Sequence, residues 1–271
     1  MRQSTVMKRP PRRGAASLRA LPLLACSVCA AQVSHEQVNE ANNPLTPKIT
    51  VNLQDDYAPR LYDLGGYTNS ALLRGVLPHK LGGVPQIFRG TLPVSTVPDA
   101  AGNSTTGFGD LNLIDMLLFK QGHVELGIGP QLTIPTASED ETGTGKWQAG
   151  LAGVVIAPQK WGLLGGLLTW QHSFAGDDDR ATQNNLTAQP FFMYNLPQGW
   201  YLRSTGTWSF DLENHRRVIP IGAGIGKVWA LAGGDTVNLF VEPQWTVSHK
   251  GAGQPQFQVF AGVNMQFALG R

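Results

Sequence analysis

Six charged residues stand among polar neighbours at alternating positions, which suits the lining of a polar interior. They are Arg74, Arg89, Glu125, Arg203, Asp211 and Glu242. Opposed charges across a narrow passage make a transverse field that orders water and polar solutes, whereas charges of one sign confer strong ion selectivity. Because both signs occur, the sequence predicts weak selectivity. The alternative is that these charges pair with one another and fill the interior.

Residue types used in catalysis and metal binding occur without the spacing that such chemistry needs. His172 and Ser173 are adjacent, but neighbours in a strand face opposite sides and cannot act as base and nucleophile. The six histidines lack metal spacing, and the glycine-rich run 222–227 lacks the Ser or Thr that follows the Lys of a phosphate loop. The acidic runs 139–141 and 177–179 indicate solvated loops, with cation binding as an alternative. We expect no enzyme activity, cofactor or metal, and keep a membrane-embedded lipid hydrolase as a weaker alternative.

The elements that position the six charges are strands with one apolar and one polar face. Residues 236–248 alternate with a period of two, with Phe240 as the one apolar residue on the polar face, and residues 256–267 repeat the pattern. Twelve such segments follow one another, the first at 48–57. The polar face is too polar for the core of a soluble sandwich.

Connections between these segments alternate in length. Those near residues 80–83, 120–122, 159–161, 197–199 and 232–234 are tight turns, and those near 96–107, 137–146, 175–184, 213–217 and 249–254 are longer and more polar. An even number of strands of about ten residues with this alternation is typical of a bacterial outer-membrane barrel. Prolines at 93, 130, 190, 220 and 243 are the main objection to the barrel, because each removes a donor from a strand ladder; bulges near the rims are expected to absorb some of them. Glycines 222, 224 and 226 are expected to face inward and to leave space, and aromatic residues near strand ends (Trp147, Trp161, Trp170, Trp200, Tyr201 and Trp229) are expected at the membrane interfaces.

The first 31 residues have the pattern of a secretory signal, with a basic region followed by an apolar run. An alternative is a lipoprotein signal with Cys26 lipidated. The segment holds six of the 21 Lys and Arg and none of the 19 acidic residues, so the remainder has 15 basic residues and a net charge of −4. It also holds both cysteines, Cys26 and Cys29. The basicity of the whole chain is therefore a targeting feature, and nucleic acid is not an expected partner.

Two blocks of sequence resemble an outer-membrane family named for the meta-pathway of phenol degradation. The first is Thr106-Gly-Phe-Gly-Asp110, and the second is the run 132–137 followed, after an acidic loop, by 143–147. Members are similar to transporters in a wider group that includes the long-chain fatty acid barrels. The resemblance covers roughly residues 45–268 and implies passage of small, aromatic or apolar, compounds; it implies no catalytic residues. Phe267 is followed by four further residues, whereas many barrels end on the aromatic residue that serves as the assembly signal.

The sequence therefore predicts an all-β protein, a transmembrane antiparallel β-barrel of about 12 strands. The expected divisions are a signal peptide over 1–31, a flexible lead-in over 32–47 that occupies part of the lumen, and the barrel over 48–271. The expected function is a porin-like channel or transporter in the outer membrane, and the alternative is an exported soluble β-protein that binds a small ligand. Expected partners are outer-membrane lipid and lipopolysaccharide, a small-molecule solute and the barrel assembly machinery.

Overall fold

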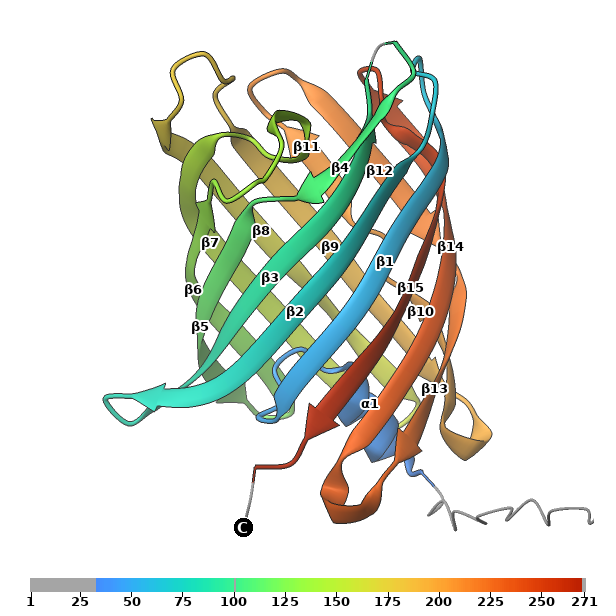
Figure 1. The fold of residues 1–271 in the computed structure, drawn as a ribbon. Coiled ribbons are helices and arrows are strands. Elements are labelled where there is room, and N and C mark those ends of the chain that lie inside the picture. The colour runs from blue at the N-terminus through green and yellow to red at the C-terminus, as the bar shows by residue number, and fades with distance from the viewer. Residues whose placement is uncertain (1–32, 100, 270–271) are drawn as a thin grey trace, which may run out of the picture.

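A computed structural model describes residues 33–99 and 101–269, and these residues form a closed antiparallel β-barrel (Figure 1). The barrel closes because β1 pairs with both β2 and β15. The strands are β1 (Ile49–Leu61), β2 (Thr68–Leu81), β3 (Val84–Pro98), β4 (Ser104–Phe108), β5 (Leu111–Gln121), β6 (Val124–Ile134), β7 (Lys146–Gln159), β8 (Gly162–Gly176), β9 (Asn184–Asn195), β10 (Trp200–Ser204), β11 (Trp208–Asp211), β12 (Arg216–Gly222), β13 (Gly224–Ala230), β14 (Thr236–Lys250) and β15 (Pro255–Phe267). Helix α1 spans His35–Asn42, and three short 3₁₀ turns are η1 (Asp140–Thr142), η2 (Pro197–Gly199) and η3 (Ala232–Gly234).

These fifteen segments make the predicted twelve strands of the wall, because three strands are interrupted. β4 and β5 both pair with β3, β10 and β11 both pair with β9, and β12 and β13 both pair with β14. The prediction treated each of these strands as continuous. A bulge before Pro220 absorbs the proline of β12, whereas the pairings of Pro93, Pro130, Pro190 and Pro243 show no register shift.

Each strand has an apolar outer face and a polar inner face. On β1, Thr50, Asn52 and Gln54 are buried, while Leu53 between them is 58% exposed. Trp147, Trp161 and Trp200 are exposed at strand ends, as interfacial aromatics require, whereas Trp170 is exposed in the middle of β8. Tyr201 is a correction, because its ring is fully buried in the lumen and its hydroxyl donates to Asn238 Oδ1 at 2.7 Å.

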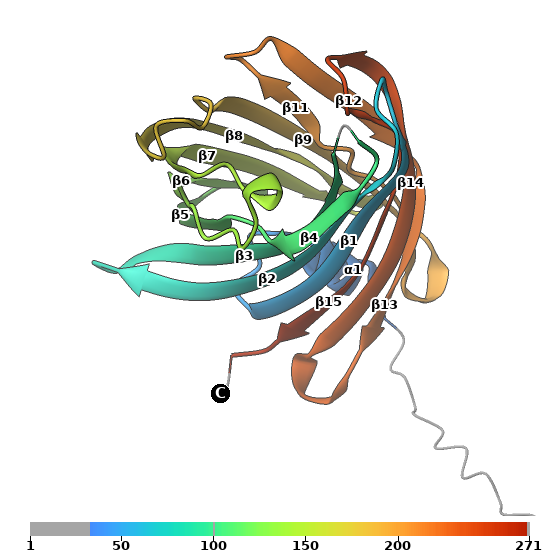
Figure 2. The ribbon, with the colours of Figure 1, turned by 45° about the horizontal axis from the view of Figure 1, so that its top comes forward.

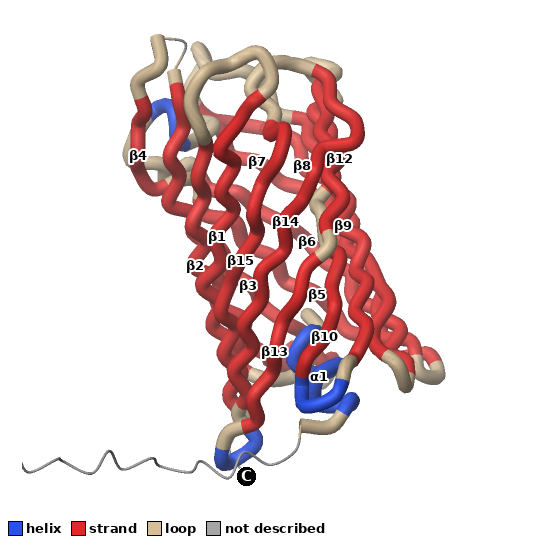
Figure 3. The backbone as a smooth tube through the Cα atoms, turned by 90° about the vertical axis from the view of Figure 1, so that its right-hand side faces the viewer, coloured by secondary structure: helices blue, strands red, loops and turns tan. Residues whose placement is uncertain are grey.

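The two ends of the barrel differ in their connections (Figure 3). The end that carries α1 has short turns, such as residues 82–83 between β2 and β3 and residues 160–161 between β7 and β8. Both ends of the described chain also lie there (Figures 1 and 3). The opposite end carries longer loops, including residues 135–145 and 177–183. This arrangement is the alternation that the sequence predicted.

The lead-in is an ordered helix where the sequence predicted a flexible segment. Ser34 caps α1, because its hydroxyl accepts from Gln37 N at 3.2 Å while the Gln37 side chain accepts from Ser34 N at 2.9 Å. Figures 1 and 2 place α1 inside the barrel outline at the short-turn end. The predicted signal and its cleavage site lie outside the described residues.

Helix α1 docks on one side of the lumen. Val38 and Ala41 are buried in a cluster with Ile156, Leu163, Met193, Tyr201 and Val228, which belong to β7, β8, β9, β10 and β13. Wall amides satisfy the backbone carbonyls at the end of the helix, since Asn238 Nδ2 donates to Ala41 O at 3.3 Å and Gln266 Nε2 donates to Glu40 O at 3.3 Å. Apolar burial and these hydrogen bonds together fix the helix against β8, β9, β13 and β14.

Candidate functional site: the barrel lumen

Four cavities follow one another along the lumen, and each shares lining residues with the next. The mouth cavity, about 490 Å³, and the upper cavity, about 290 Å³, share Asn112. The lower cavity, about 130 Å³, shares six residues with the upper one: Arg74, Arg89, Leu167, Gln189, Thr205 and Phe260. The base cavity, about 910 Å³, shares Asn43 and Thr46 with the lower one. The series of cavities, called the path below, extends from the long-loop end to the short-turn end, and the lower cavity is its smallest member.

The path passes α1 on the side where the helix is not docked. The base cavity is lined by Lys80, Pro85, Leu118, Lys120 and Glu125 of β2, β3, β5 and β6 together with residues of α1 and the segment that follows it. Pairing of β3 with β5 begins only at Gln86, so the turn end of the β2–β3 hairpin diverges from the wall (Figures 1 and 2). The helix therefore narrows the lumen without filling its width.

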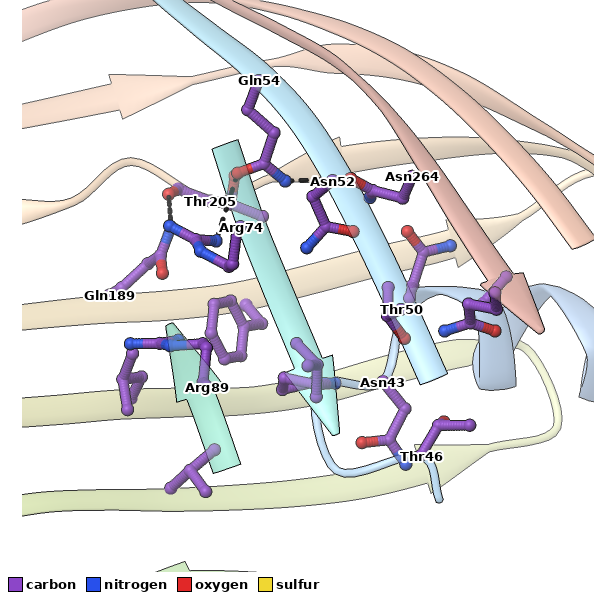
Figure 4. Close-up of a pocket in the computed structure, with 18 of the residues that line it drawn as sticks. Asn43, Thr46, Thr50, Asn52, Gln54, Arg74, Arg89, Gln189, Thr205 and Asn264 are labelled. Atoms are coloured by element: carbon purple, nitrogen blue, oxygen red, sulfur yellow. Dashed lines mark hydrogen bonds between the residues drawn. The ribbon is translucent and has the colours of Figure 1, made fainter. Parts of the chain in front are cut away.

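Arg74 and Arg89 line both the upper and the lower cavity, and Figure 4 shows them in the lower one. Arg74 Nε donates to Thr91 Oγ1 at 3.1 Å and Arg74 Nη1 donates to Gln54 Oε1 at 3.1 Å, both neutral acceptors. Gln54 in turn donates to Asn264 Oδ1 at 3.0 Å. Arg89 Nε is buried and has no hydrogen-bond partner. The structure places both arginines on the inner face of the β2–β3 pair.

Arg203 and Glu242 form a buried ion pair on the other side of the lumen. Arg203 Nε donates to Glu242 Oε2 at 2.7 Å, and the guanidinium carbon lies 3.6 Å from the centre of the Phe240 ring. Glu242 is fully buried and also accepts from Thr205 N and Thr205 Oγ1, each at 2.7 Å, and from Gln244 Nε2 at 3.0 Å. Arg203 and Glu242 therefore follow the alternative expectation, in which inward charges pair with one another and fill the interior.

This ion pair also explains why the wall can be interrupted nearby. Residues 205–207 between β10 and β11 leave the ladder, and the N–H of Thr205 would be unsatisfied without the Glu242 carboxylate. Ala223, between β12 and β13, donates its N–H to Pro243 O at 3.2 Å. Glu242 therefore replaces a ladder hydrogen bond where the strand breaks.

The inward glycines do not leave the open space that the sequence predicted. A Cβ on Gly222 would lie 2.3 Å from Glu242 Oε1, and one on Gly226 would lie 2.3 Å from Tyr201 Cζ. A Cβ on Gly224 would lie 2.5 Å from the carbonyl oxygen of Val241. The side chains of Glu242 and Tyr201 occupy the volume that these glycines release, so this wall is filled.

The other predicted site residues lie away from the constriction. Glu125 lines the base cavity, where its Oε2 accepts from Asn43 Nδ2 at 2.6 Å and its Oε1 lies 3.8 Å from Lys120 Nζ. Asp211 is at the long-loop end of β11 and accepts from the backbone and side chain of Asn214, each at 2.9 Å, outside the four cavities.

The hydroxyl of Ser173 accepts from Gln183 N at 3.0 Å. The acidic run 139–141 lies at η1, and run 177–179 lies in the β8–β9 connection.

The sequence blocks that carry the family resemblance meet at the mouth cavity. Asp110 accepts from Thr144 N at 2.8 Å, from Thr144 Oγ1 at 2.7 Å and from Ala137 N at 3.4 Å. Phe108 O accepts from Thr142 Oγ1 at 2.8 Å. The blocks therefore tie the β4–β5 junction to the β6–β7 loop, which is a structural role.

Several residues of the path were missed by sequence reasoning. The lower cavity is lined by Asn43, Thr46, Gln189 and Thr205, and the upper cavity is lined by Asp56. The capping box at Ser34 and Gln37, followed by Val38 and Ala41, is the sequence signal that would have revealed α1. Gln189 and Thr205 carried no signal, because an uncharged polar residue on an inner face is common to every strand.

Among the described residues, no helix is long and apolar enough to cross a membrane. No model of a known protein family matches the sequence, and no curated protein matches it. The structure is similar to the crystal structure of the COG4313 outer membrane channel from Pseudomonas putida F1, with a TM-score of 0.61, 17% identity, and 81% of this chain and 94% of that chain covered. It is also similar to the NanC porin, with a TM-score of 0.51, 7% identity, and 82% and 100% covered.

The chain has the fold of an outer-membrane channel. At these identities the likeness concerns the fold alone, and the path through the lumen comes from the side chains of this chain. A third solved structure, the KdgM porin in complex with disordered oligogalacturonate, aligns at a TM-score of 0.44 and 10% identity over 82% of this chain and 99% of that chain.

Proposed function

We propose that the protein is an outer-membrane channel through which small solutes with apolar or aromatic bodies pass by diffusion. The observation that carries this proposal is the series of four cavities, each sharing lining residues with the next, from the mouth past α1 to the base. Leu167, Phe191, Met193 and Phe260 supply apolar surface in the smallest of them, the lower cavity. The solute class also follows the family resemblance, which stays a prediction.

The outer surface supports a membrane location for the barrel. Large apolar side chains alternate along its strands, and Leu73 and Leu151 are more than half exposed. In water this surface would be an extended apolar patch, whereas in a bilayer it meets lipid. The implied partners are outer-membrane lipid, lipopolysaccharide and the barrel assembly machinery.

Reconstitution of the mature chain in planar bilayers tests the proposal. We expect a small ion conductance from the whole mature chain and a larger one after removal of residues 32–47, because α1 narrows the short-turn end. Absence of current in both proteins would contradict a channel and leave a ligand-binding barrel. Fractionation into the periplasm without detergent would favour the soluble alternative.

Labelling on intact cells tests the orientation. A cysteine at Asp178, in the β8–β9 connection, should react with an impermeant maleimide, and a cysteine at Gln198, in η2, should not. The reverse pattern would contradict an orientation in which the long loops face outside the cell.

A further inference from the structure

Arg74 and Arg89 are neighbours on the inner face of the β2–β3 pair. Arg74 lies opposite Thr91 and Arg89 lies opposite Val76, so the two arginines are diagonal neighbours with Cα atoms about 7 Å apart. Like charges at this spacing repel each other.

Neither guanidinium has a carboxylate partner among the residues that the structure describes. The ion pairs found within 4.0 Å in residues 33–99 and 101–269 involve Lys48, His79, Lys120 and Arg203 as the cations. Arg74 is held by neutral acceptors, and Arg89 Nε is buried without an acceptor. A buried donor of a charged group is costly to leave unpaired, and an anion entering the lumen would satisfy it.

The surface next to the arginines is apolar. Leu167 and Phe260 line both the upper and the lower cavity, and Phe191 and Val76 line the lower one. A cavity of about 150 Å³ is known to hold one benzene ring. Cavities of about 130 and 290 Å³ that meet at the arginines are therefore of the size for one ring or a short aliphatic chain with a single anionic head.

The groups around the arginines favour a single carboxylate. Arg203 is neutralised by Glu242, so among the described residues Arg74 and Arg89 are the guanidinium groups of these cavities without a carboxylate partner. Asp56 also lines the upper cavity, where its carboxyl group accepts from Gln258 Nε2 at 3.0 Å. One carboxylate can take the bidentate geometry that guanidinium groups offer, and the apolar surface next to it leaves the remaining space to an uncharged body.

We infer that Arg74 and Arg89 form a binding site for small monocarboxylates with an apolar body, in which the carboxylate contacts the guanidinium groups and the body contacts Leu167 and Phe260. The site adds a solute class to the proposed channel function, and its role in transport rests on that function. Binding itself does not depend on conduction. The two ideas can therefore fail separately.

The test measures equilibrium binding and selectivity on the same mature protein. Calorimetry in detergent compares benzoate with acetate, which lacks the ring, and with benzylammonium, which has the ring and the opposite charge. Bi-ionic reversal potentials in planar bilayers, with potassium benzoate on one side and potassium chloride on the other, give the relative permeability. The variants are R74Q/R89Q, R74K/R89K and, as a matched loss of charge outside the four cavities, R217Q.

We expect benzoate to bind more tightly than acetate, and benzylammonium not to bind. R74Q/R89Q should weaken benzoate binding at least about tenfold, the factor for one lost charge-assisted hydrogen bond. R74K/R89K should restore part of it, and R217Q should leave it unchanged. All variants are compared for folding by the heat-dependent shift in electrophoretic mobility.

Two results would overturn the inference. One is equal benzoate binding by the wild type and a folded R74Q/R89Q, and the other is benzylammonium binding as tightly as benzoate. Benzoate binding that depends on the arginines in a protein without conductance would support the site and contradict the channel. Conductance with no effect of the arginines on binding or on reversal potential would support the channel and contradict the site.

Discussion

Arg203 on β10 and Arg89 on β3 both point into the lumen, but their surroundings are opposite. Arg203 contacts a carboxylate, a hydroxyl and an aromatic ring, whereas Arg89 Nε has no acceptor. The difference extends to the two sides of the barrel. The β7–β14 side is packed around α1 and the ion pair, although its Leu167, Phe191 and Arg203 also line the lower cavity, and the β1–β6 side lines the base cavity. The groups that surround an inward-facing charge therefore decide whether it stabilises the wall or can bind a solute.

The largest effect is expected from breaking the ion pair on the filled side. Glu242→Gln leaves Arg203 buried without a counter-charge and removes the best acceptor of Thr205 N, so it should destabilise the barrel by about 3–5 kcal/mol. Urea unfolding in detergent measures the change. Arg89→Gln is the matched control and should change stability by no more than about 0.5 kcal/mol. Equal losses for the two variants would contradict the distinction between the sides.

The next effect concerns α1, which completes the filled side. Val38→Asp places a carboxylate in a fully buried apolar site, at a cost of several kcal/mol that opposes docking of the helix. Conductance should rise towards that of the protein without residues 32–47. His35→Gln, at an exposed position of the same helix outside the four cavities, should leave the conductance unchanged. A rise in both variants would contradict the link between docking and current.

A smaller effect sharpens the description of the open side. At about pH 9, where the Asp56 carboxyl group is ionised, Asp56→Asn removes a negative charge from the cavity that Arg74 and Arg89 line and keeps an acceptor for Gln258. Benzoate should then bind severalfold more tightly and the channel should become more anion-selective. Calorimetry and reversal potentials measure both. Weaker binding would mean that Asp56 helps to hold the solute.

The smallest expected effect is a pH dependence in the β3–β4 connection, which belongs to neither side of the lumen. Hydrogen bonds from the side chain and backbone of Asn103 hold the pKa of Asp99 below its ordinary value of about 3.9. A lowered pKa contributes stability that is present above about pH 4 and is lost as the pH falls through the folded value. Chemical shifts of the Asn103 amide should therefore change only in strong acid. Asp99→Asn should abolish that change, and a transition near pH 6 would contradict the assignment.

The alternation of side chains made the barrel predictable, because lipid on one face and a lumen on the other impose a period of two on every strand. The inward positions of Arg74, Arg89, Arg203 and Glu242 followed from the same period. The period could not predict that Arg203 pairs with Glu242 while Arg74 and Arg89 have no carboxylate partner among the described residues, because pairing depends on which strands lie close to each other in the barrel. The sequence also could not predict that the Tyr201 side chain fills the space next to Gly226. These two residues are neighbours only because of the register in which β10 pairs with β13.

Cysteine modification at the constriction tests the central claim most directly, because both native cysteines fall within the predicted signal. The claim is that ions and solutes pass beside Arg89. In Arg89→Cys, a negatively charged methanethiosulfonate should reduce the chloride current, and a positively charged one should restore the anion preference. Leu53→Cys, on the lipid-facing side of β1, should respond to neither. Currents from Arg89→Cys that ignore both reagents, in a channel that conducts, would contradict a path between the upper and lower cavities.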